Sequence, residues 1–227
     1  MRALTHPEGF KPGTKRFLLA TLVAFTALGL FGIPLPLLLA ERFGLPSASV
    51  YVYFLIQHVA IVVAYPLAAN RIRRAGNRWV QILSLAVRMV LFAGVAAFLA
   101  LVQATPPTWA LVVSFVIYGL TWSFFQLSGV ALVSRLAKPE NRGTALGLYN
   151  ALAGVGWILA GVGSGSLAGR AGYASLFGVS AGLLVLALAI LLVVPDPVSR
   201  PAPPARDVCP PAEDLQNGEG NGTVDIG

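Results

Sequence analysis

The chain has 227 residues, of which 56% are hydrophobic and 11% are charged, and its net charge is +7. This composition excludes an ordinary soluble domain, because the apolar residues form blocks of about twenty, enough to cross a hydrocarbon core of about 30 Å. The basic residues gather between these blocks and not on one polar face interleaved with aromatic residues, which argues against a nucleic-acid partner. The single cysteine, Cys209, excludes an internal disulfide and a cysteine-built metal site.

Three parts are expected along the chain: a basic cytoplasmic leader over residues 1–16, a six-helix transmembrane domain over residues 17–194 and a disordered cytoplasmic tail over residues 195–227. The first apolar run is too long for a signal-peptide core, so we expect it to remain in the mature protein. The tail is rich in Pro, Gly, Asn and acidic residues, and this composition buries too little apolar surface to offset the entropy of ordering.

The first predicted helix covers residues 17–40, and its second half contains Pro34 and Pro36. Each proline removes a helical hydrogen-bond donor and clashes with the preceding turn, so we expect a kink there. Broken backbone at membrane depth is tolerated where protein or a water-filled cavity satisfies it, which makes this half-helix a candidate cavity wall. A simple packing kink would explain the two prolines equally well. The later helices are predicted over residues 49–70, 79–103, 109–136, 144–168 and 173–194.

The segment 66–79 is predicted to be a short cytoplasmic loop between two apolar runs, because it is rich in arginine and holds no acid. Its arginines are Arg71, Arg73, Arg74 and Arg78. With six helices and a cytoplasmic N-terminus, thirteen of the sixteen basic residues lie inside and two, Arg42 and Arg170, lie outside. Since cytoplasmic loops are enriched in Lys and Arg, this distribution predicts a multi-pass protein of the inner or plasma membrane with both termini in the cytoplasm.

Two predicted helices end in similar residues. The second ends in Leu67-Ala68 with Ala75-Gly76 beyond it, and the fifth ends in Leu167-Ala168 with Ala171-Gly172 beyond it. The second helix ends inside and the fifth ends outside, so the shared ending predicts two three-helix units of opposite topology. The expected fold is an all-α membrane protein whose six transmembrane helices form two inverted repeats, an architecture common among secondary transporters.

Two segments resemble the major facilitator superfamily, and the resemblance extends over roughly residues 15–195. The first segment resembles the family signature Gly-x-x-x-Asp-Arg-x-Gly-Arg-Arg, although its spacing is longer and Asn70 stands where the acid is usual. This departure weighs against a salt-bridge role in gating. The candidate gating loop comprises Asn70, Arg71, Arg73, Arg74, Gly76 and Arg78.

The second segment is residues 139–147, Pro-Glu-Asn-Arg-Gly-Thr-Ala-Leu-Gly, which resembles the family's link into its fifth or eleventh helix. The glycines that follow resemble the glycine-rich helix of the family, and close packing by small residues would account for most of them. They are Gly147, Gly154, Gly156, Gly161, Gly163 and Gly165. The Gly-Pro step of the antiporter version is missing, so the resemblance does not imply antiport.

The resemblance implies half of a major facilitator fold, since a full member has twelve helices and holds its substrate between two six-helix halves. The basic leader and the polar tail look more like the C-terminal half. The implied function is secondary transport of a small-molecule substrate across the lipid bilayer by alternating access, with a second six-helix half or as a homodimer. The alternative is a non-transporting membrane subunit or a truncated remnant of a transporter.

The predicted spans contain no Asp or Glu, so proton coupling by an intramembrane carboxylate would need a partner half. Arg88 is the formal charge within a span, about 14 Å into its helix at 1.5 Å per residue. An ionisable residue at this depth is a functional hypothesis, so Arg88 is a candidate for binding an anionic group or a partner's acid. The alternative is a packing role in which it bonds to helix-end carbonyls.

Other candidate substrate-binding residues share helix faces. Tyr118, Trp122 and Gln126 recur at four-residue spacing, and an aromatic-aromatic-amide stripe suits a partly apolar substrate; ordinary packing is the alternative. Gln57 and His58 lie mid-span, where His58 is a candidate proton relay or a hydrogen-bonded neutral side chain. Asn150 lies two turns before Trp157, and the two are expected to face the same cavity.

An enzymatic function has no residues to support it, since the sequence shows no nucleophile constellation and no phosphate-binding loop. We therefore expect no catalytic residues, no cofactor and no metal site.

Overall fold

The computed structural model describes residues 13–102 and 104–195, which form helices and no strand. Five of these helices are long and apolar enough to cross a membrane. Most of the predicted leader and nearly all of the predicted tail, including Cys209, lie outside the described residues.

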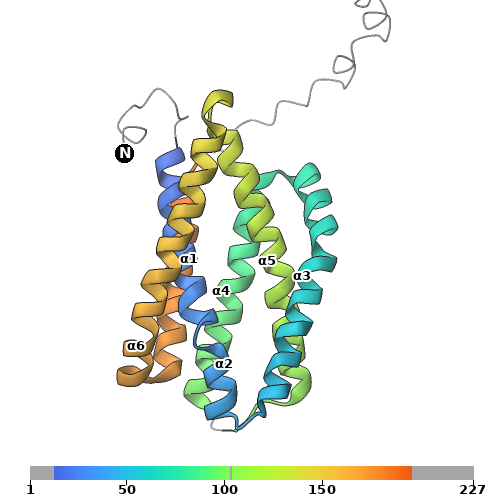
Figure 1. Ribbon diagram of the computed structural model, residues 1–227, viewed down its shortest axis with the longest axis vertical. Coiled ribbons are helices and arrows are strands. Elements are labelled where there is room, and N and C mark those ends of the chain that lie inside the picture. The colour runs from blue at the N-terminus through green and yellow to red at the C-terminus, as the bar shows by residue number, and fades with distance from the viewer. Residues whose placement is uncertain (1–12, 103, 196–227) are drawn as a thin grey trace, which may run out of the picture. The chain divides into compact units, whose positions relative to one another are not determined.

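The helices of the described part pack side by side with their axes along one direction (Figure 1). Their bounds, in chain order, are α1 (Thr14–Gly32), α2 (Leu35–Leu37), the π-helical turn η3 (Leu38–Arg42), α3 (Ser47–Ala75), α4 (Asn77–Leu101), α5 (Thr108–Leu136), the 3₁₀ turn η4 (Pro139–Asn141) and α6 (Arg142–Leu192).

The first membrane-length helix is interrupted where the two prolines stand. α1 ends at Gly32, and Pro34 precedes the single turn of α2, which continues into the π-helical turn η3. A proline cannot donate to the preceding turn, and wider π-type turns are one way for a helix to absorb the lost hydrogen bond. The chain therefore continues as a broken half-helix, residues 33–42, whose buried side chains are Pro34, Leu35, Leu38 and Leu39.

The predicted arginine loop is almost entirely helical in the structure, so that expectation needs correction. Arg71, Arg73 and Arg74 belong to the last turns of α3, and Arg78 lies in the first turn of α4. The connection is Gly76, with φ 83° and ψ 157°, a conformation essentially restricted to glycine. Charged side chains did not end the helix here, because Arg has high helix propensity and the reversal needs one permissive residue.

The long helix α6 has non-helical dihedral angles at Gly172, φ 76° and ψ 169°, which divide it into a first arm (142–171) and a second arm (173–192). The first arm runs parallel to α1, because Gly156 contacts Phe25 while Ala160 contacts Gly29. The second arm runs antiparallel to α1, since Phe177 packs against Phe31 with tilted rings and Ser180 donates to the carbonyl of Ala27 at 2.6 Å. The chain therefore reverses direction at Gly172.

The central helix is α5, which contacts helices on two sides. It runs parallel to α3, because Tyr53 packs on Phe115 while Ser123 Oγ donates to the Ile61 carbonyl at 2.7 Å. It runs antiparallel to α4, where Ser128 donates to Gln81 near one end and Arg88 donates to Tyr118 near the middle.

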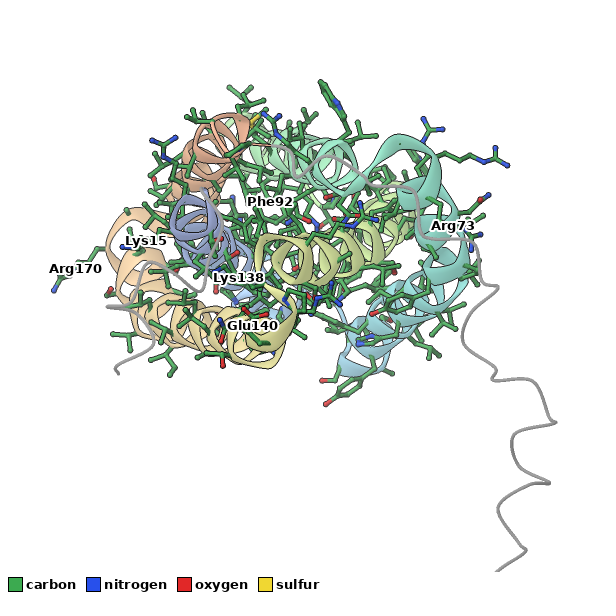
Figure 2. The ribbon with its side chains drawn as sticks, turned by 90° about the horizontal axis from the view of Figure 1, so that it is seen from above. Lys15, Arg73, Phe92, Lys138, Glu140 and Arg170 are labelled. Atoms are coloured by element: carbon green, nitrogen blue, oxygen red, sulfur yellow. The ribbon has the colours of Figure 1, made fainter. Side chains whose placement is uncertain are left out.

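Aromatic side chains fill the centre of the bundle. Phe31 of α1 stacks on Phe92 of α4 with ring centroids 3.8 Å apart, and it also packs against Tyr118 and Phe177. Phe92 is fully buried, and the view along the bundle shows it among the helices (Figure 2). Four helices thus meet around Phe31, which places a dry aromatic layer across the middle of the bundle.

The six glycines for which close packing was expected divide into two groups: added Cβ atoms at Gly156, Gly161 and Gly163 would lie within 4 Å of neighbouring atoms, and those at the other three would not. Gly156 is packed tightly, since an added Cβ would lie 2.9 Å from Phe25 Cβ. By contrast, added Cβ atoms at Gly147, Gly154 and Gly165 would meet nothing within 4 Å. These glycines lie on the exposed face of the first arm of α6.

Candidate functional site

The structure brings Arg88 together with two of the predicted aromatic residues. Its Nη2 donates to the Tyr118 carbonyl oxygen at 2.8 Å, and its Cζ lies 4.5 Å from the ring centroid of Tyr118 and 5.3 Å from that of Trp122. Arg88 has no exposed surface. A guanidinium held between two aromatic faces in a dry interior gains a cation–π interaction that is stronger than the same contact in water.

The positive charge of Arg88 has no carboxylate near it in the described part of the chain. The acids there are Glu41 and Glu140, which lie in η3 and η4. Arg88 Nε and Nη1 are buried and have no hydrogen-bond partner among the described residues. Because a buried unpaired charge is costly, a buried guanidinium with unused N–H groups at Nε and Nη1 is able to accept an anionic group.

A buried polar stripe on α4 leads to Arg88, and the sequence interpretation missed it. Asn77, Gln81, Ser84 and Arg88 are all buried and follow helical spacing on an otherwise apolar helix. Gln81 accepts a hydrogen bond from Ser128, whereas both side-chain polar atoms of Asn77 lack partners among the described residues. Their shared spacing with Arg88 was the signal available in the sequence.

Three helices meet beside this cluster. An added Cβ at Gly32 would lie 3.1 Å from the Tyr118 hydroxyl oxygen and 3.7 Å from the Trp157 ring, so α1, α5 and the first arm of α6 share one seam. Gln126 continues along α5, and its buried Oε1 has no partner among the described residues. The seam therefore offers aromatic surface beside Arg88 and, one turn beyond Trp122 along α5, an amide oxygen without a partner among the described residues.

The remaining predicted residues lie elsewhere. Gln57 is buried where α3 packs on Gly119 of α5, and its Oε1 has no partner among the described residues. His58 is exposed on α3, and its Nδ1 donates to the Phe54 carbonyl oxygen at 2.7 Å. Asn150 is exposed on the first arm of α6, so His58 and Asn150 do not belong to the Arg88 cluster.

The predicted gating residues gather at the end of the bundle where α1 begins. Arg78 Nη2 donates to the carbonyl of Leu192 at the end of α6, 2.6 Å away, where the helix dipole favours a cation. Lys15, Arg73 and Lys138 are drawn in the view onto this end (Figure 2). Arg78 thus connects α4 to the second arm of α6. This contact is compatible with a gating role and with a purely structural one.

The exposed surfaces of the helices differ in polarity. Exposed residues of α4 from 79 to 101 and of the second arm from 178 to 193 carry apolar or aromatic side chains or are glycine. The exposed surface of α3 includes Tyr51, His58 and Tyr65, and that of the first arm includes Asn150. Apolar outer faces suit contact with lipid; α3 and the first arm expose aliphatic side chains as well, such as Val62 and Ile158, beside these polar ones.

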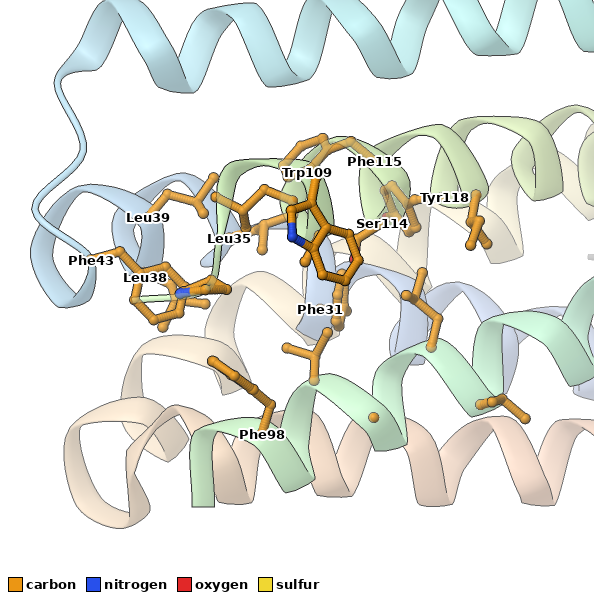
Figure 3. Close-up of a pocket in the computed structure, with 18 of the residues that line it drawn as sticks. Phe31, Leu35, Leu38, Leu39, Phe43, Phe98, Trp109, Ser114, Phe115 and Tyr118 are labelled. Carbon is orange, nitrogen blue, oxygen red and sulfur yellow. The ribbon is translucent and has the colours of Figure 1, made fainter. Parts of the chain in front are cut away.

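A second feature is an apolar cavity of about 830 Å³ between the broken half-helix, α4 and α5 (Figure 3). Its walls include Leu35, Leu38 and Leu39, so the half-helix does border a cavity. Of the seven candidate substrate residues, Tyr118 lines it and the other six do not. Its lining offers almost no polar group, which sets it apart from the Arg88 cluster.

Comparison with known proteins places these features in a family. Residues 17–219 match the family model for the major facilitator superfamily. Over 200 residues the chain is 30% identical to the MFS-type transporter ppzB of Metarhizium rileyi, an alignment covering 84% of this chain and 40% of the relative. The chain thus spans less than half the length of that relative. Together with the apolar helices, the match identifies a multi-pass membrane protein, and the chain belongs to the major facilitator superfamily.

Proposed function

We propose that the described part of the chain crosses the membrane six times as two inverted three-helix repeats. The first repeat comprises α1 with its broken half-helix, α3 and α4; the second comprises α5 and the two arms of α6. The protein lies in the inner or plasma membrane, and both of its termini face the cytoplasm. The distribution of basic residues favours this orientation.

The two reversals support the repeat. Gly76 joins the second helix of one unit to its third, and Gly172 does the same in the other unit, with φ and ψ within about 12° of each other. Each follows an alanine and ends a helix containing Leu-Ala, at residues 67–68 and 167–168.

The helix packing supports the same symmetry. A two-fold axis in the membrane plane would exchange α1 with α5 and α3 with the first arm, so the α3–α5 contact should match the contact of the first arm with α1. Both pairs are parallel. Gly119 of α5 packs against Gln57 and Ala60 of α3, and Gly29 of α1 packs against Trp157 and Ala160 of the first arm.

The function that this architecture supports best is secondary transport of a small solute by alternating access, in which one bundle rocks against another around a central site. The observation that carries the substrate class is Arg88, a mid-membrane cation with two unpartnered N–H groups beside the rings of Tyr118 and Trp122. The substrate is a small organic anion with an apolar body. The charge would meet Arg88 and the apolar body would meet the aromatic seam.

The chain would act with a second six-helix bundle, either another polypeptide or a second copy. The exposed polar residues and unfilled glycines favour α3 and the first arm as the surface that meets it, because small residues let helix backbones approach closely in a membrane. On the opposite side, α4 and the second arm face lipid.

The experiment is counterflow of radiolabelled benzoate into proteoliposomes holding the full chain. Saturable counterflow is expected, and Arg88→Gln should reduce it about tenfold or more, since losing a charge-assisted hydrogen bond of about 1.5–3 kcal/mol has an effect of that size. Gly182→Ala on the lipid-facing side is the matched control and should leave counterflow unchanged.

Crosslinking tests the partner separately. In a Cys209→Ser background, Gly154→Cys should form crosslinked pairs with a short bis-maleimide, whereas Gly182→Cys should not. A strictly monomeric chain without counterflow would contradict the homodimeric transporter and favour the non-transporting subunit.

A further inference from the structure

The apolar cavity of about 830 Å³ is separate from the place where the transported anion would bind. We propose that it holds an acyl chain of a bilayer phospholipid, in the leaflet farther from the N-terminus. Its size lies in the range of ligand-binding pockets, about 300–1,000 Å³. Three structural arguments lead to this occupant.

The first argument is chemical. Among the lining residues, Ser114, Tyr118 and Trp109 carry the polar side-chain groups, and the rest are aliphatic, phenylalanine, proline or glycine. A polar solute would lose its hydration in this cavity without gaining hydrogen bonds, which is costly. An acyl chain has no polar group to satisfy.

The second argument is the position of the cavity in the bundle. Its lining residues on α4 run from Ala86 to Phe98 and those on α5 begin at Trp109 and end at Tyr118, so it occupies the half of the membrane span away from the N-terminus. The broken half-helix forms one wall of the cavity with the side chains of Leu35, Leu38 and Leu39 (Figure 3).

The third argument concerns access. The lining residues Val87, Val90 and Gly94 belong to the exposed face of α4 that carries no polar side chain between residues 79 and 101. The cavity is therefore continuous with the lipid-facing surface, and a chain can enter sideways from the bilayer. Trp109 is 70% exposed on the cavity rim, near the helix end, where tryptophan favours the membrane interface.

The antiparallel pairing of α4 and α5 identifies residues that face each other across the cavity. The pairs Arg88–Tyr118 and Gln81–Ser128 place Gly94 opposite residues 112–115 of α5, a turn that includes Ser114. A Cβ added at Gly94 would meet nothing within 4 Å, so larger side chains fit there without strain. Leucine at both positions should narrow the cavity from its two walls and weaken binding of the acyl chain.

The test uses a phosphatidylcholine with a diazirine at the end of one acyl chain, incorporated with the full chain in nanodiscs, irradiated and mapped by mass spectrometry. We expect adducts on residues 86–98 and 109–118. The double variant Gly94→Leu with Ser114→Leu should lower labelling there about tenfold, which corresponds to a loss of 1.4 kcal/mol in binding free energy. Gly182→Leu, on an exposed position of the second arm with open space, should keep full labelling.

Uniform labelling of all lipid-facing helices, or labelling unchanged by the double variant, would overturn the proposal. A free fatty acid carrying the same diazirine distinguishes the source, and labelling by the acid without labelling by the phospholipid would also overturn it. If the double variant does not fold, judged by circular dichroism and gel filtration, Ala86→Leu narrows the same cavity with a smaller change. Its labelling should fall in the same direction.

Discussion

Replacing Arg88 by methionine separates a binding role from a packing role, because the two roles predict opposite changes in stability. Methionine has a similar length and no charge, and it can fill the space between Tyr118 and Trp122. The substitution removes one hydrogen bond to a carbonyl, worth about 1.5–3 kcal/mol, and a buried cation–π contact of about 2 kcal/mol.

The carbonyl that loses Arg88 is not left unsatisfied. Thr121 Oγ1 also donates to the Tyr118 carbonyl oxygen at 3.1 Å. The substitution also removes two unfavourable contributions to the free energy of the folded state. One is the cost of a charge at mid-membrane, about 2.5–3.5 kcal/mol on insertion scales. The other is the cost of two buried groups without hydrogen-bond partners, about 1–3 kcal/mol each. We therefore expect Arg88→Met to stabilise the folded chain by roughly 1–4 kcal/mol, as in other replacements of buried charges by apolar residues.

Thermal unfolding in mild detergent measures this change. A gain of 1 kcal/mol raises Tm by roughly 2–4 °C in a chain of this size, so a rise of several degrees is expected. Benzoate counterflow should be lost in the same variant, because methionine has no charge to bind the anion. A gain in stability together with a loss of counterflow is typical of a residue that binds substrate. A fall of several degrees in Tm would refute the reasoning, since it would mean that Arg88 stabilises the bundle through its present contacts. Ser84→Ala, one turn away on the same face of α4, is the matched control for altering this buried stripe.

Three further predictions concern the fold. Gly119→Ala should destabilise the chain by about 1–3 kcal/mol, because the added Cβ overlaps the Gln57 carbonyl, whereas Gly154→Ala, with open space around it, should not lower Tm. Gly76→Ala and Gly172→Ala should each lower the folding stability by about 1–3 kcal/mol through backbone strain, although neither added Cβ would meet an atom within 4 Å. If these variants had the same Tm as Gly182→Ala, the result would count against the shared backbone reversal. In a Cys209→Ser background, an impermeant maleimide should label Glu140→Cys and Arg74→Cys from the cytoplasmic side and Arg170→Cys from the other; labelling of all three from one side would contradict the six crossings.

The sequence predicted the helices well because their signal is long and redundant. Apolar blocks of membrane length mark the helices without any detail of packing, and the prolines at 34 and 36 mark the break because each removes a helical hydrogen-bond donor. The ends were less predictable. α3 continues to Ala75, beyond the predicted 70, since arginine favours helix and the reversal depends on the backbone of Gly76 alone.

The site was predictable only in part, for a geometric reason. Spacing along one helix placed Tyr118, Trp122 and Gln126 on related faces, but it carries no information on which neighbour meets them. The contact of Arg88 with Tyr118 depends on the register between α4 and α5, which tertiary packing sets. His58 and Asn150 lie on exposed surfaces of α3 and the first arm, so their predicted place beside a cavity depends on the proposed second bundle.

Tyr118 connects the two sites that have been proposed. Its carbonyl and ring hold Arg88, while the residue also forms part of the cavity lining between α4 and α5. Its hydroxyl reaches Gly32, just before the helix break whose far side forms one wall of the cavity. Filling or emptying the cavity therefore acts on the same side chain that positions the mid-membrane cation. If an acyl chain occupies the cavity, the Gly94→Leu and Ser114→Leu double variant should alter the apparent affinity for benzoate while leaving the two N–H donors of Arg88 in place.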